Sequence, residues 1–147
     1  MNKDKIAIFT VSVMVLIALF FVFTHKSGDL KPKTLSIGDA VIVIDIADNE
    51  ILREKGLSGR QTLSDSSGML FIFPEVSTPG FWMKEMLFPL DIIWISEDKK
   101  VVSVSENLKP ESYPSVFYPT GPVKYVLEVP TGFSQKHNVS IGEPLSF

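Results

Sequence analysis

Cysteine is absent from this sequence of 147 residues, and histidine occurs only twice. Without cysteine the chain can form no disulfide, no thiolate zinc site and no cysteine nucleophile. His25 and His137 are too few for a histidine-rich metal site, and a Ser-His-Asp triad would have to use His137. Because the sequence also has no phosphate loop, nucleophile elbow or zinc motif, we expect no metal and no cofactor.

Positive charge is scarce over most of the chain. From Thr34 onward there are nine lysines and arginines against fifteen aspartates and glutamates, a formal charge of −6. Proteins that bind nucleic acid neutralise phosphates with lysine and arginine, so this balance predicts no nucleic-acid partner. It also disfavours direct binding of this region to anionic lipid headgroups.

One segment lacks charge altogether. Ile6–Phe23 is 18 residues long, and Thr10 and Ser12 are its only polar members. A helix of this length spans about 27 Å at ~1.5 Å per residue, close to a hydrocarbon core of ~30 Å. The run exceeds the ~7–15 apolar residues of a signal-peptide core, and the flank 24–27 lacks small residues at both cleavage-determining positions. We therefore expect an uncleaved transmembrane anchor rather than a cleaved signal peptide.

The anchor divides the chain into four parts. We expect a cytoplasmic tail at 1–5, the anchor at 6–23, a polar linker at 24–33 and a soluble β domain at 34–147. Basic residues flank the anchor on both sides, so their count alone does not favour one orientation. A short tail before an apolar segment normally stays in the cytoplasm, which predicts a single-pass membrane protein with an extracytoplasmic domain in a prokaryotic cell envelope.

The pattern after the linker is mainly β. Expected strands, rich in β-branched or alternating apolar residues, are 35–37, 40–46, 69–73, 81–84, 90–95, 100–105, 124–129 and an edge strand within 143–147. The stretch 107–122 holds four prolines and predicts an ordered loop. Seven or so short strands with one short helix predict a small barrel-like or rolled sheet.

The one predicted helix is 49–55. Asp48 is the expected N-cap and Gly56 the expected C-terminal cap. Ile51, Leu52 and Leu57 are expected to dock this helix on the core.

Three sequence blocks stand out by their order and spacing. They are Glu54–Leu57 followed by Arg60, then Gly68–Phe73 leading to Phe81–Lys84 and Pro89–Ile92, and finally Tyr125–Pro130 followed by Gly132. Together they resemble the uncharacterised prokaryotic family known as domain of unknown function 192, over residues 34–147. The resemblance implies a small, mainly β, barrel-like domain, commonly behind a signal peptide or a single anchor. It implies no established substrate and hence no catalytic residue.

The chain departs from that family pattern at two places. Glu85-Met86 stands where members usually carry Asn-Thr, and Ser58 stands where they usually carry Met. A shared site to which the Asn-Thr pair contributed polar groups would be altered in this chain.

Trp82 and Lys84 are candidate ligand-binding residues. In a strand they share one face, while Phe81 and Met83 share the other. On a solvent-facing surface Trp82 and Lys84 would combine ring stacking with positive charge. Alternatively, Trp82 is half-buried beneath the proline-rich loop and Lys84 extends past it to solvent.

Arg60 and Asp91 are candidates because their charges need partners. Arg60 lies in a glycine-flanked turn, where a guanidinium can bind a ligand's carboxylate or an internal one such as Glu128 or Asp91. Asp91 begins an apolar strand, and a buried carboxylate is costly unless it is paired or hydrogen-bonded. It belongs either to a polar cleft with Lys84 or Arg60, or to a strand entry bonded to backbone amides after Pro89.

The leading hypothesis is a membrane-anchored, non-catalytic binding or accessory module at the cell envelope. Its binding site would comprise Arg60, Trp82, Lys84, Asp91 and Glu128. Its partners would be the membrane, through Ile6–Phe23, and either a small polar ligand or an envelope protein.

Two other hypotheses belong to different classes of function. A carboxylate-dependent hydrolase of an envelope substrate would use Asp91 or Glu128, with Glu85 as a further candidate, and needs paired carboxylates in one pocket. A structural or assembly protein would instead present Tyr113, Phe117 and Tyr118 of loop 107–122 to a partner.

Overall fold

The computed structural model describes residues 33–147. The predicted tail, the anchor at Ile6–Phe23 and nearly all of the linker lie outside the described residues. Within residues 33–147, no helix has the length and apolar character needed to cross a membrane.

The described chain is mainly β. Its strands are β1 (Thr34–Ile37), β2 (Ala40–Ala47), β3 (Ser67–Ser77), β4 (Phe81–Trp82), β5 (Leu90–Ile95), β6 (Val101–Leu108), β7 (Val116–Phe117), β8 (Val123–Pro130) and β9 (Leu145–Ser146). Its helices are α2 (Glu50–Lys55), α3 (Phe133–Lys136) and a 3-10 turn at Pro110–Ser112.

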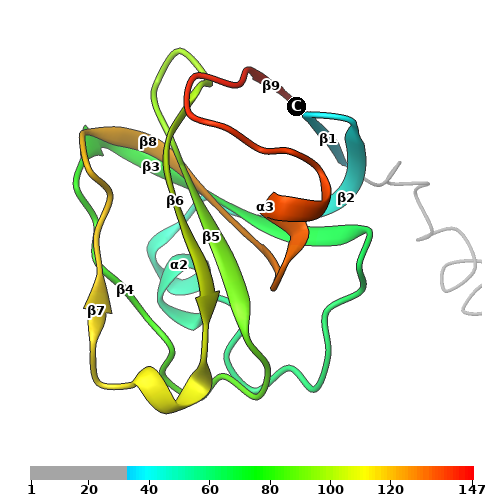
Figure 1. Cartoon of the computed structure of the whole chain (residues 1–147). Helices are drawn as coiled ribbons and strands as arrows, with labels where there is room; N and C mark the ends of the chain where they lie inside the picture. The colour runs from blue at the N-terminus through cyan, green and yellow to red at the C-terminus, as the bar shows by residue number, and fades with distance from the viewer. Residues whose placement is uncertain (1–32) are drawn as a thin grey trace, which may run out of the picture. The chain divides into compact units, whose positions relative to one another are not determined.

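Seven strands form one curled sheet in the order β6-β5-β8-β3-β2-β1-β9. All neighbours are antiparallel except β2 and β3, which are parallel. The two edges are joined at one end, because Val101 N donates to Glu143 O at 3.0 Å and Leu145 N donates to Lys99 O at 2.9 Å. The predicted mainly β, rolled sheet is therefore confirmed, as a curled half-barrel. β4 and β7 pair separately as a ribbon beside α2 (Figure 1).

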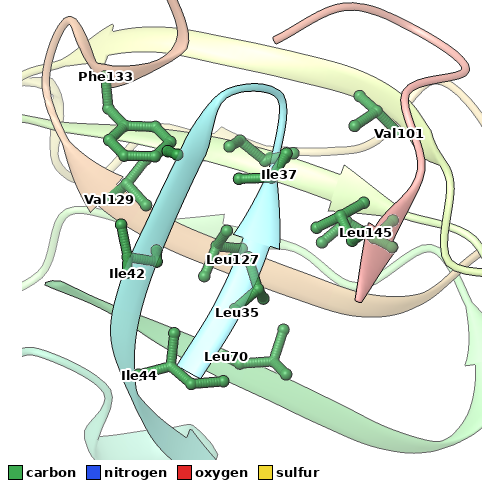
Figure 2. Close-up of a cluster of buried hydrophobic side chains, with 13 residues drawn as sticks. Leu35, Ile37, Ile42, Ile44, Leu70, Val101, Leu127, Val129, Phe133 and Leu145 are labelled. Carbon is green, nitrogen blue, oxygen red and sulfur yellow. The ribbon is translucent and has the colours of Figure 1, made fainter. Parts of the chain in front are cut away.

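The concave face of the sheet holds one hydrophobic core. Leu127 and Val129 of β8 point into it, together with side chains of β1, β2 and β3 and with Phe133 of α3 (Figure 2). The alternation predicted for 124–129 is confirmed, because Val126 lies in a second core on the opposite face. That second core lies beneath α2 and β4 and includes Leu57, Phe71 and Trp94.

Helix α2 begins one residue later than predicted. The N-cap is Asn49, not Asp48, because Asn49 Oδ1 accepts from Leu52 N at 3.0 Å. The docking prediction is wrong for two of its three residues: Ile51 is 79% exposed and Leu52 41% exposed. A six-residue helix can bury little of its own surface, so Leu57 docks it instead, after the chain turns at Gly56 with φ +50°.

Three other predicted elements have different bounds. β3 continues through Pro74, past the predicted end of the strand. The pairing of β3 with β8 is interrupted between Ile72 and Ser77, so the N–H that proline lacks is not needed for a hydrogen bond between these strands. β4 ends at Trp82, and loop 107–122 contains the short strand that pairs with it. The prediction of a single helix is also wrong, since α3 forms after the turn at Gly132.

Candidate functional site

Glu128 lies in a row of side chains that crosses the second face of the sheet. It pairs with Met69 of β3 on one side and with Ile92 of β5 on the other, and Met69 in turn pairs with Asp45 of β2. β3 and β8 approach closely there, since a Cβ added to Gly68 would meet Glu128 O at 2.7 Å. The row thus places one acidic side chain in the middle of a largely apolar face.

A cavity of about 240 Å³ opens over this face between α2, β3 and β4. Its lining is apolar and aromatic over much of its extent: Leu57, Phe71, Phe73, Pro79, Phe81, Trp82 and Met86. Its polar lining residues are Arg53, Glu54, Lys55, Ser58 and Glu128. We call this space the α2–β4 cavity. A concave, apolar space with a few polar groups has the composition of a small-molecule site.

Two hydrogen bonds join the two walls of the α2–β4 cavity. Ser58 Oγ donates to Lys84 O at 3.1 Å, and Gly59 N donates to Glu85 O at 3.0 Å. A third fixes Arg53, whose Nη1 donates to Ile72 O at 2.9 Å while its guanidinium lies over the Phe73 ring at 5.4 Å. The turn after α2 is therefore tied to the turn after β4.

Glu128 is a buried acid in the lining of the α2–β4 cavity. Its residue is 6% exposed, and its Oε2 has no hydrogen-bond partner among residues 33–147. Burial raises the pKa of the Glu128 carboxyl to about 8 from an ordinary value of 4.5, and the positive charge of Arg60 limits that rise. At neutral pH this carboxyl is therefore mostly protonated, and it can act as a hydrogen-bond donor.

Trp82 lines the α2–β4 cavity, and Lys84 lines a neighbouring hollow. The predicted pattern of exposure is confirmed, because Trp82 is 53% exposed and Lys84 is exposed, whereas Met83 is buried. Phe81, however, lines the same cavity as Trp82. Trp82 lines both this cavity and a neighbouring hollow that contains Lys84, Lys55 and Glu85. Aromatic and basic groups thus meet in the hollow that Trp82 shares with Lys84.

Arg60 forms an internal ion pair, as its position predicts, but with a partner that sequence reasoning missed. Arg60 Nη1 lies 2.7 Å from Asp45 Oδ2, and neither Glu128 nor Asp91 is its partner. Asp45 stands in the β2 strand, where alternation with Ile44 and Ile46 could have shown that it shares a face with Glu128. Arg60 lines a hollow that shares Lys55, Gly56 and Ser58 with the cavity.

Asp91 lies on the opposite face of the sheet, away from the other four candidates. It pairs with Val129 and is fully buried. Its Oδ1 accepts from Asn107 N at 2.9 Å and its Oδ2 from Ser134 N at 3.0 Å. The interpretation of Asp91 as a backbone-bonded residue is therefore confirmed, with donors in β6 and α3 rather than in the residues after Pro89. Asp91 and Glu128 share no pocket, so these two residues do not form the paired-carboxylate site.

The two departures from the family pattern also lie at the α2–β4 cavity. Ser58 lines it and forms one of the hydrogen bonds that join its walls. Met86 lines it with 7% of its surface exposed, and Glu85 precedes it at φ +58°. Ser58 and Met86, two of the three residues at these positions, therefore line the cavity.

No group of three or more His, Asp or Glu side chains is placed to hold a metal ion in residues 33–147.

Comparison with known proteins gives family members and solved structures of the same fold. The family model described as "Uncharacterized ACR", domain of unknown function 192, matches residues 33–147. A UPF0127 protein of Pyrococcus furiosus is 30% identical over 111 residues, covering 72% of this chain and 87% of that protein. A UPF0127 protein of Pyrococcus abyssi is 29% identical over 109 residues, covering 71% and 85%.

Two solved structures resemble the domain closely. A protein of unknown function from Novosphingobium aromaticivorans has a TM-score of 0.75 and 25% identity, covering 84% of this chain and 90% of that one. A protein from Sinorhizobium meliloti 1021, described as a "putative transcription regulator", has a TM-score of 0.73 and 29% identity, covering 81% and 97%.

Proposed function

The chain belongs to the uncharacterised domain of unknown function 192 family, and on that premise we propose that its domain is a non-catalytic binding module for a small ligand. The ligand occupies the α2–β4 cavity, with its apolar body against Phe71, Phe81 and Trp82 and a polar group toward Glu128. The single observation that carries this proposal is the unpartnered Oε2 of a buried glutamate on the wall of an aromatic cavity.

Buried polar atoms in folded proteins nearly always have a hydrogen-bond partner. A buried group without one costs about 1–3 kcal/mol, which a bound molecule can recover by supplying the partner. The volume of about 240 Å³ is below the ~300–1,000 Å³ of drug-sized pockets. The ligand is therefore a small molecule, or a larger one that inserts only one group.

A fragment screen with the full chain in lipid nanodiscs tests this function. The methyl groups of Met86, inside the cavity, and of Met69, beside Glu128, report binding by NMR. We expect Trp82→Ala to weaken the best fragment at least fivefold, because Trp82 lines the cavity. Tyr118→Ala is the matched control: Tyr118 is 60% exposed and does not line the cavity. Equal affinity in wild type and Trp82→Ala would reject the site.

Nucleic acid is not the ligand in this proposal. The formal charge of −6 from Thr34 onward opposes binding to phosphates. The Sinorhizobium meliloti protein is described as a regulator. If this chain had a regulatory role, it would act through a protein or small-molecule partner, because the negative charge from Thr34 onward does not favour binding to DNA.

The proposal also includes a membrane anchor at Ile6–Phe23, with the domain outside the cytoplasm. The uncharged run of 18 residues supports it, and the short tail before that run supports the orientation. Carbonate extraction of native membranes should leave the full chain in the pellet, and protease added to spheroplasts should digest the domain. Release by carbonate would contradict the anchor, and protection from protease would contradict the orientation.

A second candidate function is protein docking by the β4–β7 ribbon. Tyr113 and Tyr118 are 48% and 60% exposed, and the Trp82 ring meets the Tyr113 ring edge-on with centroids 6.5 Å apart. Exposed aromatic residues are enriched in interfaces. A photo-crosslinker at Tyr118 in native membranes should then give one adduct that Tyr113→Ala abolishes. No adduct, or one insensitive to that substitution, would count against docking.

A further inference from the structure

We propose that the α2–β4 cavity selects a neutral carbonyl group over an organic cation of the same shape, because the buried Oε2 of Glu128 has no hydrogen-bond partner among residues 33–147 and the positive Arg53 and Lys55 line the same cavity. This inference rests on the proposed binding function and names the chemistry of its ligand. Its origin is geometric: Oε2 of Glu128 is buried and unpartnered among residues 33–147, and Glu128 is one of the residues that line the cavity.

An aromatic cavity that contains a carboxylate could in principle bind a cation, through ring faces and an ion pair. The charged groups around Glu128 decide between the two chemistries. They come from β2 (Asp45), from α2 and the turn after it (Arg53, Glu54, Lys55, Arg60) and from the turn after β4 (Lys84, Glu85). The neighbouring positions on β3 and β5 carry the uncharged Met69 and Ile92.

Most of these charges cannot assist a cationic ligand. Asp45 is already paired with Arg60, and Glu85 lines the neighbouring hollow rather than the cavity itself. Apart from Glu128, the charged residues that line the cavity are Arg53, Lys55 and Glu54, so a ligand cation would enter beside two positive groups and one negative group. A carbonyl oxygen meets no such repulsion.

The protonation state of Glu128 adds a second barrier to cations. With a pKa of about 8, only about a tenth of the protein carries the Glu128 carboxylate at pH 7. A ligand that requires the ionised form therefore loses roughly tenfold in apparent affinity at that pH. A carbonyl ligand uses the dominant form directly, and it is released as the pH rises through 8.

Benzamide and benzamidinium provide the matched pair of probes. They have the same ring and the same planar head, but one presents a carbonyl oxygen and the other a positive charge. The full chain in lipid nanodiscs, with carbon-13 methyl methionine, is titrated with each at pH 6.5 and pH 9.5. Met86 reports the cavity, and Met14, in the predicted anchor, reports partition of the probe into lipid.

We expect benzamide to shift Met86 at pH 6.5 with at least fivefold higher affinity than benzamidinium, and to lose at least fivefold by pH 9.5. Glu128→Gln keeps a donor, so it should retain benzamide binding at both pH values, whereas Glu128→Leu should lose it at both. Tighter binding of benzamidinium than of benzamide, or an affinity for benzamide that is the same at pH 6.5 and pH 9.5, would overturn this inference. Either result would leave the proposed binding function intact. If neither probe shifts Met86 at either pH, the proposed binding function itself fails.

Discussion

The two faces of the curled sheet each bury one carboxylate, and the two groups differ in their partners. Asp91 and Glu128 occupy adjacent strands, one register step apart, so their side chains point to opposite faces. Asp91 accepts hydrogen bonds from two backbone amides, whereas Oε2 of Glu128 has no partner in the part of the chain that the structure describes. Burial of a charged residue type therefore does not by itself indicate a site. An unmet hydrogen bond in a carboxylate that also lines a cavity does, and it distinguishes a structural acid from one available to a ligand.

The largest expected effect concerns the pH dependence of stability. The unfolded chain releases the Glu128 proton near pH 4.5, whereas the folded domain holds it to about pH 8. In this window the unfolded state binds fewer protons, so the free energy of unfolding falls as pH rises, by up to about 1.4 kcal/mol per pH unit. Between pH 5 and pH 9 the contribution of Glu128 should fall by roughly 3–4 kcal/mol. Urea denaturation of wild type and Glu128→Gln measures it as a difference.

The exposed Glu111 provides the control for that experiment. Glu111→Gln should show the same pH dependence as wild type, while Glu128→Gln should have the flatter curve. If the free energy of unfolding of wild type and of Glu128→Gln depended on pH in the same way, Glu128 would not be a buried acid with a raised pKa, and the contrast between the two buried acids would not hold.

The next largest effect is on the other face. Asp91→Ala should lower the free energy of unfolding by about 2–4 kcal/mol, because the amides of Asn107 and Ser134 lose their acceptors. Asp65→Ala, at an exposed position, serves as control in the same denaturant series. A loss below about 0.5 kcal/mol for Asp91→Ala would mean that its two hydrogen bonds do not stabilise the fold.

The smallest effect concerns the ion pair beside Glu128. Arg60 and Asp45 have side chains that are 40% and 57% exposed, so Arg60→Met should change stability by no more than about 1 kcal/mol. The same substitution removes the positive charge that limits the pKa of Glu128, so that pKa should rise further. An NMR titration of the Glu128 carboxyl measures it. A fall in pKa would show that Arg60 does not act on this carboxyl.

Much of the fold could be predicted from local patterns. The β-branched run of β2 and the alternation along β8 indicate both strands, and the predicted division of faces in β8 is the observed one. Helix α2 was harder, because Asp48 and Asn49 are both good N-caps and only the backbone conformation decides between them. The short α3 could not be predicted, since it begins where Asp91, 43 positions away in the chain, accepts from Ser134 N.

The site was predicted in part. Alternation placed Trp82 and Lys84 on an exposed face, and both line the hollow beside the α2–β4 cavity, which Trp82 also lines. Alternation also placed Glu128 with Val126, but the loss of its hydrogen-bond partners depends on the chain segments that cover that face. Those segments come from residues 53–58 and 79–86, and no local pattern specifies how they cover β8.

The central claim is that Glu128 is a buried acid that holds its proton at neutral pH. A carbon-13 NMR titration of its side-chain carboxyl, in the full chain in nanodiscs, tests this most directly, with the resonance assigned by its absence in Glu128→Gln. The account predicts a midpoint near pH 8. A midpoint near the ordinary 4.5 would show that the carboxyl is solvated or paired, and would contradict the account.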